Sequence, residues 1–233
     1  PADPSCPIRA QCVPSALEAV VAEGDLRDPL GEEAHEVAPH LVCRYPDRVL
    51  LLATDRCSVY CRFCTRSRMV GQGGGARSLD ALEPAFAWIA QNPHVREEIM
   101  SRTEGVIVSG GDPLVATDAR IEAILERLAQ ITSVDTVRIA TRVPVTLPQR
   151  VTPELCRVLR THPAVWVMTH FNHPKELTPE SRHALAQLCD AGLPVMNQTV
   201  LLAGINDDAS TLEALFRGLV RARTRPYYLL QAD

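Results

Sequence analysis

The chain has 233 residues, a formal net charge of −4 and 46% hydrophobic residues. Its length suits one large domain with a substantial core, and its composition is unlike that of disordered chains. The negative charge argues against general binding to nucleic acid or to an anionic membrane surface. No uninterrupted apolar run is long enough to span a bilayer, so we expect no membrane anchor within these residues.

The first 43 residues are expected to form a short extension ahead of the main domain. Residues 1–7 are rich in proline and should be irregular. Ser15 can cap a short amphipathic helix over residues 16–22, and residues 25–36 are typical of an exposed acidic connector. The sequence therefore predicts an N-terminal helical extension over residues 1–43 and a core domain over residues 44–233.

From residue 49 onward, short apolar runs alternate with amphipathic helical patterns. The expected strands cover residues 49–53, 105–109, 136–140, 164–170, 194–202 and 227–231. The expected helices cover residues 79–91, 118–131, 153–160, 179–191 and 209–223. Strands without polar alternation, separated by helices, indicate a parallel sheet that is covered by helices. The predicted fold class is therefore α/β.

Polar residues at or just after the ends of these strands favour one of two possible architectures. They are Cys57, Cys61, Cys64, Gly110, Gly111, Asp112, Thr141, Arg142, His170, Asn197, Gln198 and Asp233. In a barrel the carboxyl ends of the strands converge on one mouth, where active sites are built. We therefore predict a partial (βα)6 TIM-like barrel rather than an open doubly wound sheet.

Cys57, Cys61 and Cys64 follow the first of these strands in the spacing C-x3-C-x2-C. Three thiolates can hold three irons of a cubane [4Fe-4S] cluster, which proteins usually bind through four ligands. The fourth iron is then open to a ligand that is not a side chain. This pattern resembles the radical S-adenosylmethionine (SAM) enzymes, in which the amino and carboxylate groups of SAM ligate that iron.

A zinc site or a set of buried structural thiols is the alternative interpretation. Zinc prefers a closed shell of four ligands, usually supplied by paired C-x2-C elements. The sequence has no second C-x2-C and no H-x3-H element, and its other five cysteines are scattered singly. An oxygen-sensitive cluster motif without a disulfide framework predicts a reducing, cytoplasmic location.

Gly110, Gly111 and Asp112 follow the second strand of the core domain and precede a helix. Glycine lets the backbone approach a ligand closely, and a carboxylate can receive an ammonium group. Most such sequences are only tight turns. Here the segment lies one strand–helix unit after the cysteines, where radical SAM enzymes keep the element that binds SAM's amino group. We therefore expect it to contact the methionine end of SAM.

A collinear series of segments resembles the lysine 2,3-aminomutase family of radical SAM enzymes over essentially the whole chain. The segments are residues 44–48, 57–66, 109–112, 144–150, 169–174, 197–198 and 225–228. That family uses SAM as radical initiator and pyridoxal 5'-phosphate (PLP) as radical carrier. The resemblance implies an isomerase in which a 5'-deoxyadenosyl radical abstracts a β-hydrogen and the amino group migrates from Cα to Cβ. It implies L-lysine and L-β-lysine as the reactants, an electron donor such as flavodoxin or ferredoxin, and a homo-oligomer.

The resemblance also implies a role for each matching residue. The three cysteines hold the cluster, and the glycine–aspartate segment contacts SAM, while His170 and Gln198 lie near the SAM ribose. Arg44 lies beside the PLP phosphate. Arg66 clamps the substrate carboxylate, a task that suits its planar fork. Asp233 receives the ε-ammonium of lysine, so a negative group there would select a basic side chain.

The sequence departs from the family where PLP is concerned. The family's PLP-binding lysine, and a second acid that recognises the ε-ammonium of the substrate, lie beyond residue 233. Lys175 is the only lysine among 24 lysine and arginine residues, and it falls in a turn where the family has no PLP-binding residue. We therefore assign no catalytic residue and expect this chain to be a radical SAM core from a longer polypeptide. Residues 97–103 resemble a small insertion before the second strand.

Several alternatives share these motifs. An aminomutase acting on glutamate, on arginine or on a lysine destined for a translation factor remains open, although the residues after Cys64 and the final Asp233 favour free lysine. A non-catalytic iron–sulfur protein would bind a cluster without cleaving SAM, but it would not need Arg66, His170 or the glycine–aspartate segment.

Overall fold

The computed structural model describes residues 3, 5–20, 23–93 and 105–231. Eight strands form one sheet in the order β1-β2-β3-β4-β5-β6-β7-β8. The first three, β1 (Glu36–Ala38), β2 (Leu41–Tyr45) and β3 (Arg48–Thr54), pair antiparallel, whereas each later strand runs parallel to its predecessor. The later strands are β4 (Val106–Gly110), β5 (Val137–Ala140), β6 (Val165–Thr169), β7 (Val195–Leu201) and β8 (Arg225–Gln231).

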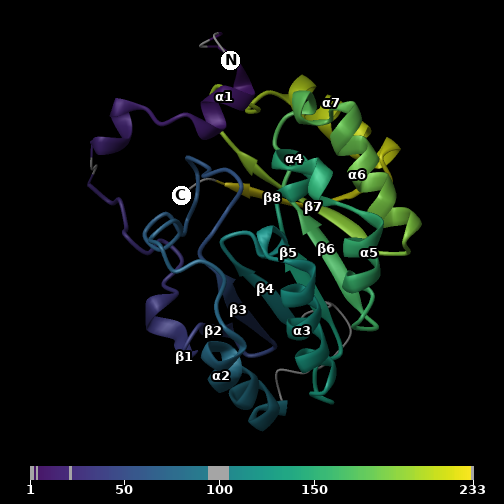
Figure 1. Ribbon diagram of the computed structural model, residues 1–233. Helices are drawn as coiled ribbons and strands as arrows, with labels where there is room; N and C mark the ends of the chain where they lie inside the picture. The colour runs from purple at the N-terminus through teal and green to yellow at the C-terminus, as the bar shows by residue number, and fades with distance from the viewer. Residues whose placement is uncertain (1–2, 4, 21–22, 94–104, 232–233) are drawn as a thin grey trace.

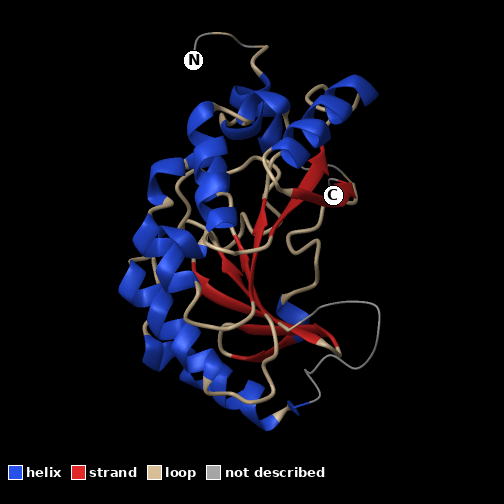
Figure 2. Ribbon diagram, turned by 90° about the vertical axis from the view of Figure 1, so that its right-hand side faces the viewer, coloured by secondary structure: helices blue, strands red, loops and turns tan. Residues whose placement is uncertain are grey.

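The six parallel strands, β3 to β8, lie side by side in the order in which the chain makes them. A doubly wound sheet instead reverses its strand order at a switch point. Within the described residues β1 and β8 do not pair, so the sheet curves without closing. Figures 1 and 2 show the main helices together on one side of this sheet. The prediction of a partial barrel with six parallel strands is confirmed.

Five main helices connect the parallel strands, and all were expected near their observed positions. They are α2 (Leu79–Gln91), α3 (Asp118–Ala129), α5 (Pro153–Leu159), α6 (Pro179–Asp190) and α7 (Ala209–Arg221). Each starts after a capping side chain that accepts a backbone N–H two or three residues into the helix, from Ser78, Thr117, Thr152, Thr178 and Asp208 in turn. A capped first turn satisfies one of the N–H groups that a helix leaves unpaired.

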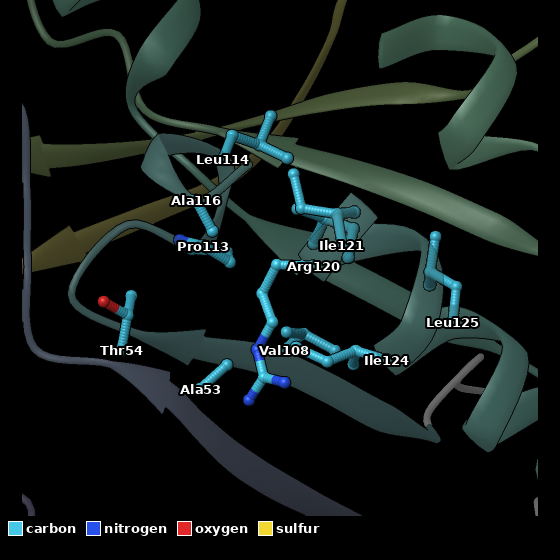
Figure 3. Close-up of a pocket in the computed structure, with 11 residues that line it drawn as sticks. Ala53, Thr54, Val108, Pro113, Leu114, Ala116, Arg120, Ile121, Ile124 and Leu125 are labelled. Atoms are coloured by element: carbon cyan, nitrogen blue, oxygen red, sulfur yellow. The ribbon is translucent and has the colours of Figure 1, made fainter. Parts of the chain in front are cut away.

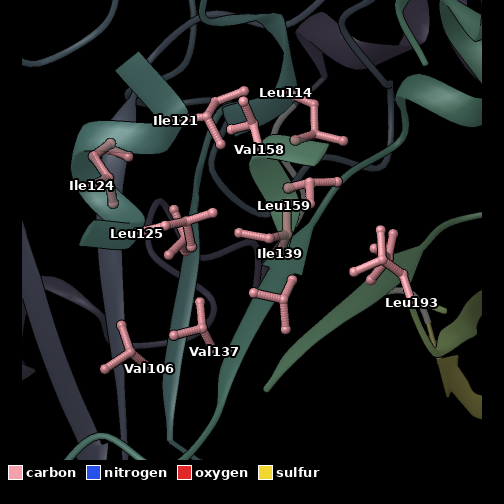
Figure 4. Close-up of a cluster of buried hydrophobic side chains, with 14 of the residues drawn as sticks. Val106, Leu114, Ile121, Ile124, Leu125, Val137, Ile139, Val158, Leu159 and Leu193 are labelled. Atoms are coloured by element: carbon pink, nitrogen blue, oxygen red, sulfur yellow. The ribbon is translucent and has the colours of Figure 1, made fainter. Parts of the chain in front are cut away.

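The hydrophobic core lies between the sheet and these helices (Figure 4). Alternate residues of neighbouring strands point toward it, because side chains of a strand alternate between its two faces. Val106 of β4 is paired in register with Val137 of β5, and both are fully buried against the helices. Ile107 and Arg138, the next residue along each strand and also paired in register, belong to the opposite face of the sheet.

The N-terminal region differs from its prediction. A short helix, α1 (Pro7–Cys12), and the antiparallel strands β1 and β2 were not expected. The helix expected over residues 16–22 is a 3-10 turn, η1 (Ala16–Ala19), where it is described. The Ser15 backbone N–H donates to the Glu18 carboxylate at 2.8 Å. The expected boundary at residue 43 falls inside β2, which belongs to the sheet of the core domain.

The expectation of an exposed acidic connector over residues 25–36 is wrong at Glu32. Its side chain is buried because two arginines from the segment after the cysteines bind its carboxylate. A run of acidic residues is usually solvated, and only tertiary partners distant in sequence bury this one. The insertion expected at residues 97–103 lies outside the described residues.

Candidate active site

The carboxyl ends of β3 to β6 and the segments after them, residues 55–76, 111–117, 141–147 and 170–177, form what we call the mouth. The first segment, the cysteine loop (residues 55–76), joins β3 to α2 and carries Cys57, Cys61 and Cys64, all half-buried. Tight turns space the thiols, with the Cys64 N–H donating to the Cys61 carbonyl and the Ser67 N–H to the Cys64 carbonyl, both at 3.2 Å. The structure thus places the three predicted cluster ligands on one ordered loop at the mouth.

The base of the cysteine loop is closed by Asp55, which sequence reasoning missed. Its carbonyl accepts the Gly71 N–H at 2.7 Å, and its buried carboxylate accepts the N–H groups of Gly74 and Gly75. The run of three glycines at residues 73–75 was the available signal, because closely packed backbone N–H groups form a cradle for an anion.

The electrostatics of the thiols suit a positively charged group of metal ions. Burial, followed by the Asp112 carboxylate and the thiols of Cys64 and Cys61, raises the pKa of Cys57 to about 12. Burial also raises the pKa of Cys61, although the neighbouring Arg142 opposes the change. Thiolates crowded in this way are stabilised by bound cations, so the loop fits an iron–sulfur cluster. In the described part of the chain, no three His, Cys, Asp or Glu side chains are arranged around a single-ion site.

Gly110 and Gly111 bring β4 against the start of the cysteine loop. Gly110 has φ of +106°, and a Cβ there would lie 2.2 Å from the Thr54 carbonyl oxygen. A Cβ on Gly111 would lie 2.3 Å from the carbonyl oxygen of Arg56. Both carbonyls instead accept hydrogen bonds of 2.7 Å, from the N–H groups of Gly111 and Asp112 respectively. These glycines therefore have a structural task beside their predicted contact with SAM, which stays a prediction.

The Asp112 carboxylate is buried and already bound by protein donors. It accepts from the Thr141 hydroxyl at 2.7 Å, the Arg142 N–H at 2.7 Å and the Leu114 N–H at 3.1 Å. Burial nevertheless raises its pKa, and these hydrogen bonds work against that rise. In this arrangement Asp112 joins the end of β4 to the segment after β5. Its predicted contact with an ammonium group stays a prediction.

Arg142 lies at the centre of the mouth, and sequence reasoning gave it no role. Its guanidinium donates to the Cys61 thiol at 2.8 Å and to the carboxylate of Glu176 and the amide oxygen of Gln11, both at 2.7 Å. The guanidinium also lies 5.3 Å from the Phe63 ring centroid. A strand-end arginine is unremarkable in a sequence, and its partners lie up to 131 residues away.

Arg66, the expected carboxylate clamp, is already bound to a carboxylate from the N-terminal region. Its Nε and Nη2 atoms donate to Glu32 at 2.9 and 2.6 Å, and Nη1 lies 3.4 Å from the Ser109 hydroxyl. Glu32 also pairs with Arg68, whose pKa is raised by Glu33, Asp28 and Glu32 against the effect of burial. Arg66 thus uses one edge of its guanidinium for protein structure.

Arg44, expected beside a phosphate, is exposed on β2 and donates to the Leu30 carbonyl at 2.8 Å. Leu30 lies two residues before Glu32, so the structure brings Arg44 and Arg66 to the same N-terminal segment. The role of Arg44 beside a phosphate stays a prediction.

His170 follows β6 and lies against the cysteine loop. Its ring centroid is 5.4 Å from that of Phe63, and its buried Nε2 atom has no hydrogen-bond partner among the described residues. Burial, with a smaller effect of Arg142, lowers the pKa of His170 to about 3, so the imidazole is neutral at pH 7. An unpartnered nitrogen at the mouth is available to a ligand, as the predicted position near the SAM ribose requires.

Asn197 and Gln198 do not follow a strand end as expected but lie within β7. Asn197 is fully buried, accepting from the Phe171 N–H at 2.7 Å and donating to the Phe171 carbonyl at 3.0 Å. The side chain of Gln198 is half-buried, and its proposed ribose contact is untested. Lys175 is exposed in the turn Pro174–Glu176, and Asp233 lies outside the described residues.

A small apolar pocket lies on the helix-covered face of the sheet (Figure 3). It is lined by β3, β4 and α3 side chains that include Val108, Ile121 and Ile124, with Arg120 reaching into it. Pro113, Leu114 and Ala116 complete the lining, so the pocket lies between α3 and the segment of the mouth that follows β4.

Comparison with known proteins agrees with this geometry. Residues 51–215 match the family model described as Radical SAM superfamily. The chain therefore belongs to the radical SAM superfamily.

Within that superfamily the expected resemblance to aminomutases is confirmed. The L-lysine 2,3-aminomutase of Fusobacterium nucleatum is 47% identical over 228 residues, which are 98% of this chain and 52% of that protein. The enzyme of the same name from Clostridium subterminale is 47% identical over 233 residues, 100% of this chain and 54% of that protein. The glutamate 2,3-aminomutase of Clostridioides difficile is 40% identical over 232 residues, 100% of this chain and 53% of that protein. The chain thus spans about half the length of these curated relatives. None of the helices in its described part is long and apolar enough to cross a membrane.

Proposed function

We propose that this protein is an amino acid 2,3-aminomutase that interconverts L-lysine and L-β-lysine with a [4Fe-4S] cluster, SAM and PLP. The observation that carries the proposal is the cysteine loop, with Arg66 two residues after its last thiol, at the mouth of a partial barrel. The similarity to curated aminomutases of lysine and glutamate supports it. A flavodoxin-like or ferredoxin-like electron donor, a homo-oligomeric state and a cytoplasmic location belong to the same proposal.

The described residues support the first part of this chemistry. When bound, the cluster and SAM supply the electron and the organic radical that begin the reaction. Cys57, Cys61 and Cys64 would hold the cluster through their thiolates. Gly111 and Asp112 fix the start of their loop through backbone hydrogen bonds to Thr54 and Arg56. A site fixed in this way holds its ligands without reorganising during the reaction.

Arg66 would bind the substrate carboxylate with the edge of its guanidinium that Glu32 leaves free. Glu32 occupies the side formed by Nε and Nη2, so the terminal edge formed by Nη1 and Nη2 still has two N–H groups in a plane. Paired N–H groups of this kind match the two oxygens of a carboxylate. Glu32 therefore orients Arg66 for its ligand.

The PLP part of the proposal rests on the similarity alone. Lys175 is the only lysine of the chain, and it is exposed in a turn of the segment after β6. It does not fit the task of a PLP-binding residue, so we derive no step through PLP from these residues. Arg44 is proposed to lie near the phosphate.

Glutamate is the alternative substrate, because a curated relative of similar coverage carries that name. The two substrates differ in side-chain charge, so an acidic pocket would select lysine and a basic pocket glutamate. Asp233 is proposed as part of an acidic pocket.

The test uses the full-length gene product, reconstituted anaerobically with iron, sulfide and PLP. Reductant and SAM are added with lysine, glutamate or arginine, and mass spectrometry measures the β-amino acids. We expect lysine to give β-lysine, and we expect this turnover to require SAM. β-Glutamate alone would establish the alternative. An intact cluster that never cleaves SAM would overturn the enzyme proposal and leave an iron–sulfur protein without radical chemistry.

A further inference from the structure

Arg142 is held in one position through its backbone N–H and both terminal nitrogens of its guanidinium, while its buried Nε has no partner among the described residues. Its backbone N–H donates to Asp112, which is itself bound to the N–H of Leu114. Its side chain is almost fully buried, with 9% of its area exposed in the ion pair with Glu176. A guanidinium fixed in this way has little freedom to leave the thiol that it contacts.

The two terminal nitrogens of the guanidinium have different partners. Nη2 donates to Glu176 and to Gln11 at 2.7 Å each. Nη1 donates to the Cys61 sulfur at 2.8 Å, with the Cys12 sulfur at 4.0 Å. An arginine guanidinium keeps its positive charge in a protein, and Glu176 supplies a counterion for it here. Cys61 therefore has a permanent positive donor on its sulfur.

We infer that Arg142 is a positioning residue that tunes the cluster by donating an N–H···S hydrogen bond to the Cys61 ligand, making the cluster easier to reduce. Reduction adds negative charge to the irons and their thiolates. Hydrogen bonds to the sulfurs and nearby net charge are among the factors that set the potential of such clusters. A donor that is also a cation stabilises the reduced state more than the oxidised state.

Glu176 lets the inference predict the direction in which the reduction potential of the cluster shifts, which a purely structural role would not do. Its carboxylate neutralises part of the Arg142 charge, and it also accepts the backbone N–H groups of Asn172 and His173. Removing the Arg142 donor should make reduction harder. Removing the Glu176 charge should make reduction easier, because the guanidinium beside Cys61 then has no counterion.

The inference rests on the proposed cluster, and the experiment separates the two. The full-length protein is reconstituted without SAM, and its cluster is titrated with reductant at controlled potential while EPR follows the reduced state. We expect R142Q to lower the ratio of reduced to oxidised cluster at a fixed potential by about tenfold, which is about 59 mV for one electron. E176Q should shift the ratio in the opposite direction.

R142K is included because it should fold even if R142Q does not. It keeps a cation for Glu176, but a lysine ammonium cannot serve Cys61, Gln11 and Glu176 with a planar fork. We expect a shift in the same direction as for R142Q, but smaller, and a changed iron–sulfur stretching band in resonance Raman spectra. R150Q is the matched control, because Arg150 is partly buried with Asp118 and contacts no thiol. Its potential should equal that of the wild type.

The outcomes are distinct. A wild-type protein that holds no [4Fe-4S] cluster refutes the proposed function. An intact cluster whose potential is the same in wild type and R142K, or shifts equally in R150Q, overturns the role of Arg142. If R142Q does not fold, R142K and E176Q decide by the presence and sign of their shifts.

Discussion

On the helix side of the sheet, Leu125 and Leu159 are fully buried and contact other apolar side chains. At the mouth, Arg142 and Glu176 are almost as deeply buried, but each depends on named hydrogen-bond partners. Apolar contacts have no preferred direction, so a core tolerates exchanges of similar volume. A buried ion pair loses far more when one partner is removed. The helix side therefore stabilises the fold through the apolar surface that it buries. The mouth instead depends on hydrogen bonds between particular atoms.

The largest expected effect separates the two regions completely. Replacing Cys57 with alanine should abolish the cluster, because two thiolates are left for four irons, while the fold should persist. Iron and sulfide content and the visible absorbance of the reconstituted protein measure the first effect, and far-ultraviolet circular dichroism measures the second. C43A is the control, since Cys43 lies half-buried on β2 and donates to the Tyr45 carbonyl. Normal cluster content in C57A would refute the assigned ligand.

Gly110 tests the contact between the two regions. G110A should destabilise the protein by roughly 4 kcal/mol, because the added Cβ meets the Thr54 carbonyl oxygen at 2.2 Å and φ is positive. G192A is the matched control, since Gly192 also has a positive φ, +81°, but its Cβ would meet nothing within 4 Å. It should cost about 1 kcal/mol. Chemical denaturation measures both, and equal losses would refute the steric account.

Leu125 tests the helix side alone. L125A should cost about 3 kcal/mol through lost burial and a cavity beside α3. The reduction potential of the cluster should not change, because the thiols in or against this core, Cys43, Cys156 and Cys189, are not predicted cluster ligands. Denaturation and potentiometric titration are compared on the same preparation. A shifted potential would show that the two regions are coupled.

Glu32 tests the mouth through substrate binding. E32Q should raise the KM for the amino acid about tenfold, about 1.4 kcal/mol of binding, with a smaller change in kcat, because Arg66 is no longer held by a carboxylate. E33Q is the control, since Glu33 pairs with Arg68 but is 66% exposed in that pair. Steady-state kinetics of the full-length enzyme provide the measurement. Equal KM values for wild type and E32Q would contradict the orienting role.

His170 has an expected effect that depends on pH and is absent above pH 6.5. Its pKa is lowered to about 3 in the folded protein, so below the unfolded value of 6.5 the unfolded chain binds a proton that the folded chain does not. This contribution to stability is complete above pH 6.5 and is lost as the pH falls toward 3, by at most about 1.4 kcal/mol per pH unit. The apo-protein variant H170N should show a weaker loss between pH 6.5 and 4.5. Parallel stability curves for the two proteins would refute this.

The sequence was sufficient for most of the framework and for the identity of the thiol loop. Capping residues such as Ser78 and Thr178 mark helix starts locally, and continuous apolar runs mark buried strands, so both could be predicted without tertiary information. The helix α1 could not, because six residues are too few to be helical without contacts from the rest of the fold. Its Gln11 is buried by side chains far along the chain.

The candidate site was predictable where chemistry depends on residue type and spacing, as in the cysteine motif. The burial of Glu32 and the partners of Arg142, whose place at a strand end was expected, were missed for a physical reason. Each residue acts through a partner that is distant in sequence, so neither has a local pattern. Asp112 shows the same limit in another form, because its residue type was recognised but its three protein donors were not.

The contacts of Gln11 set an order for the synthesis of this protein. Its amide oxygen accepts from Asn172 at 3.0 Å across 161 residues, and its carbonyl accepts from the Arg62 N–H of the cysteine loop. The cysteine loop leaves the ribosome about a hundred residues before Asn172 and Glu176, which complete its surroundings. Until then the thiols lack the side chains that bury them. The mouth can therefore reach its final arrangement only after the segment that follows β6 has been synthesised.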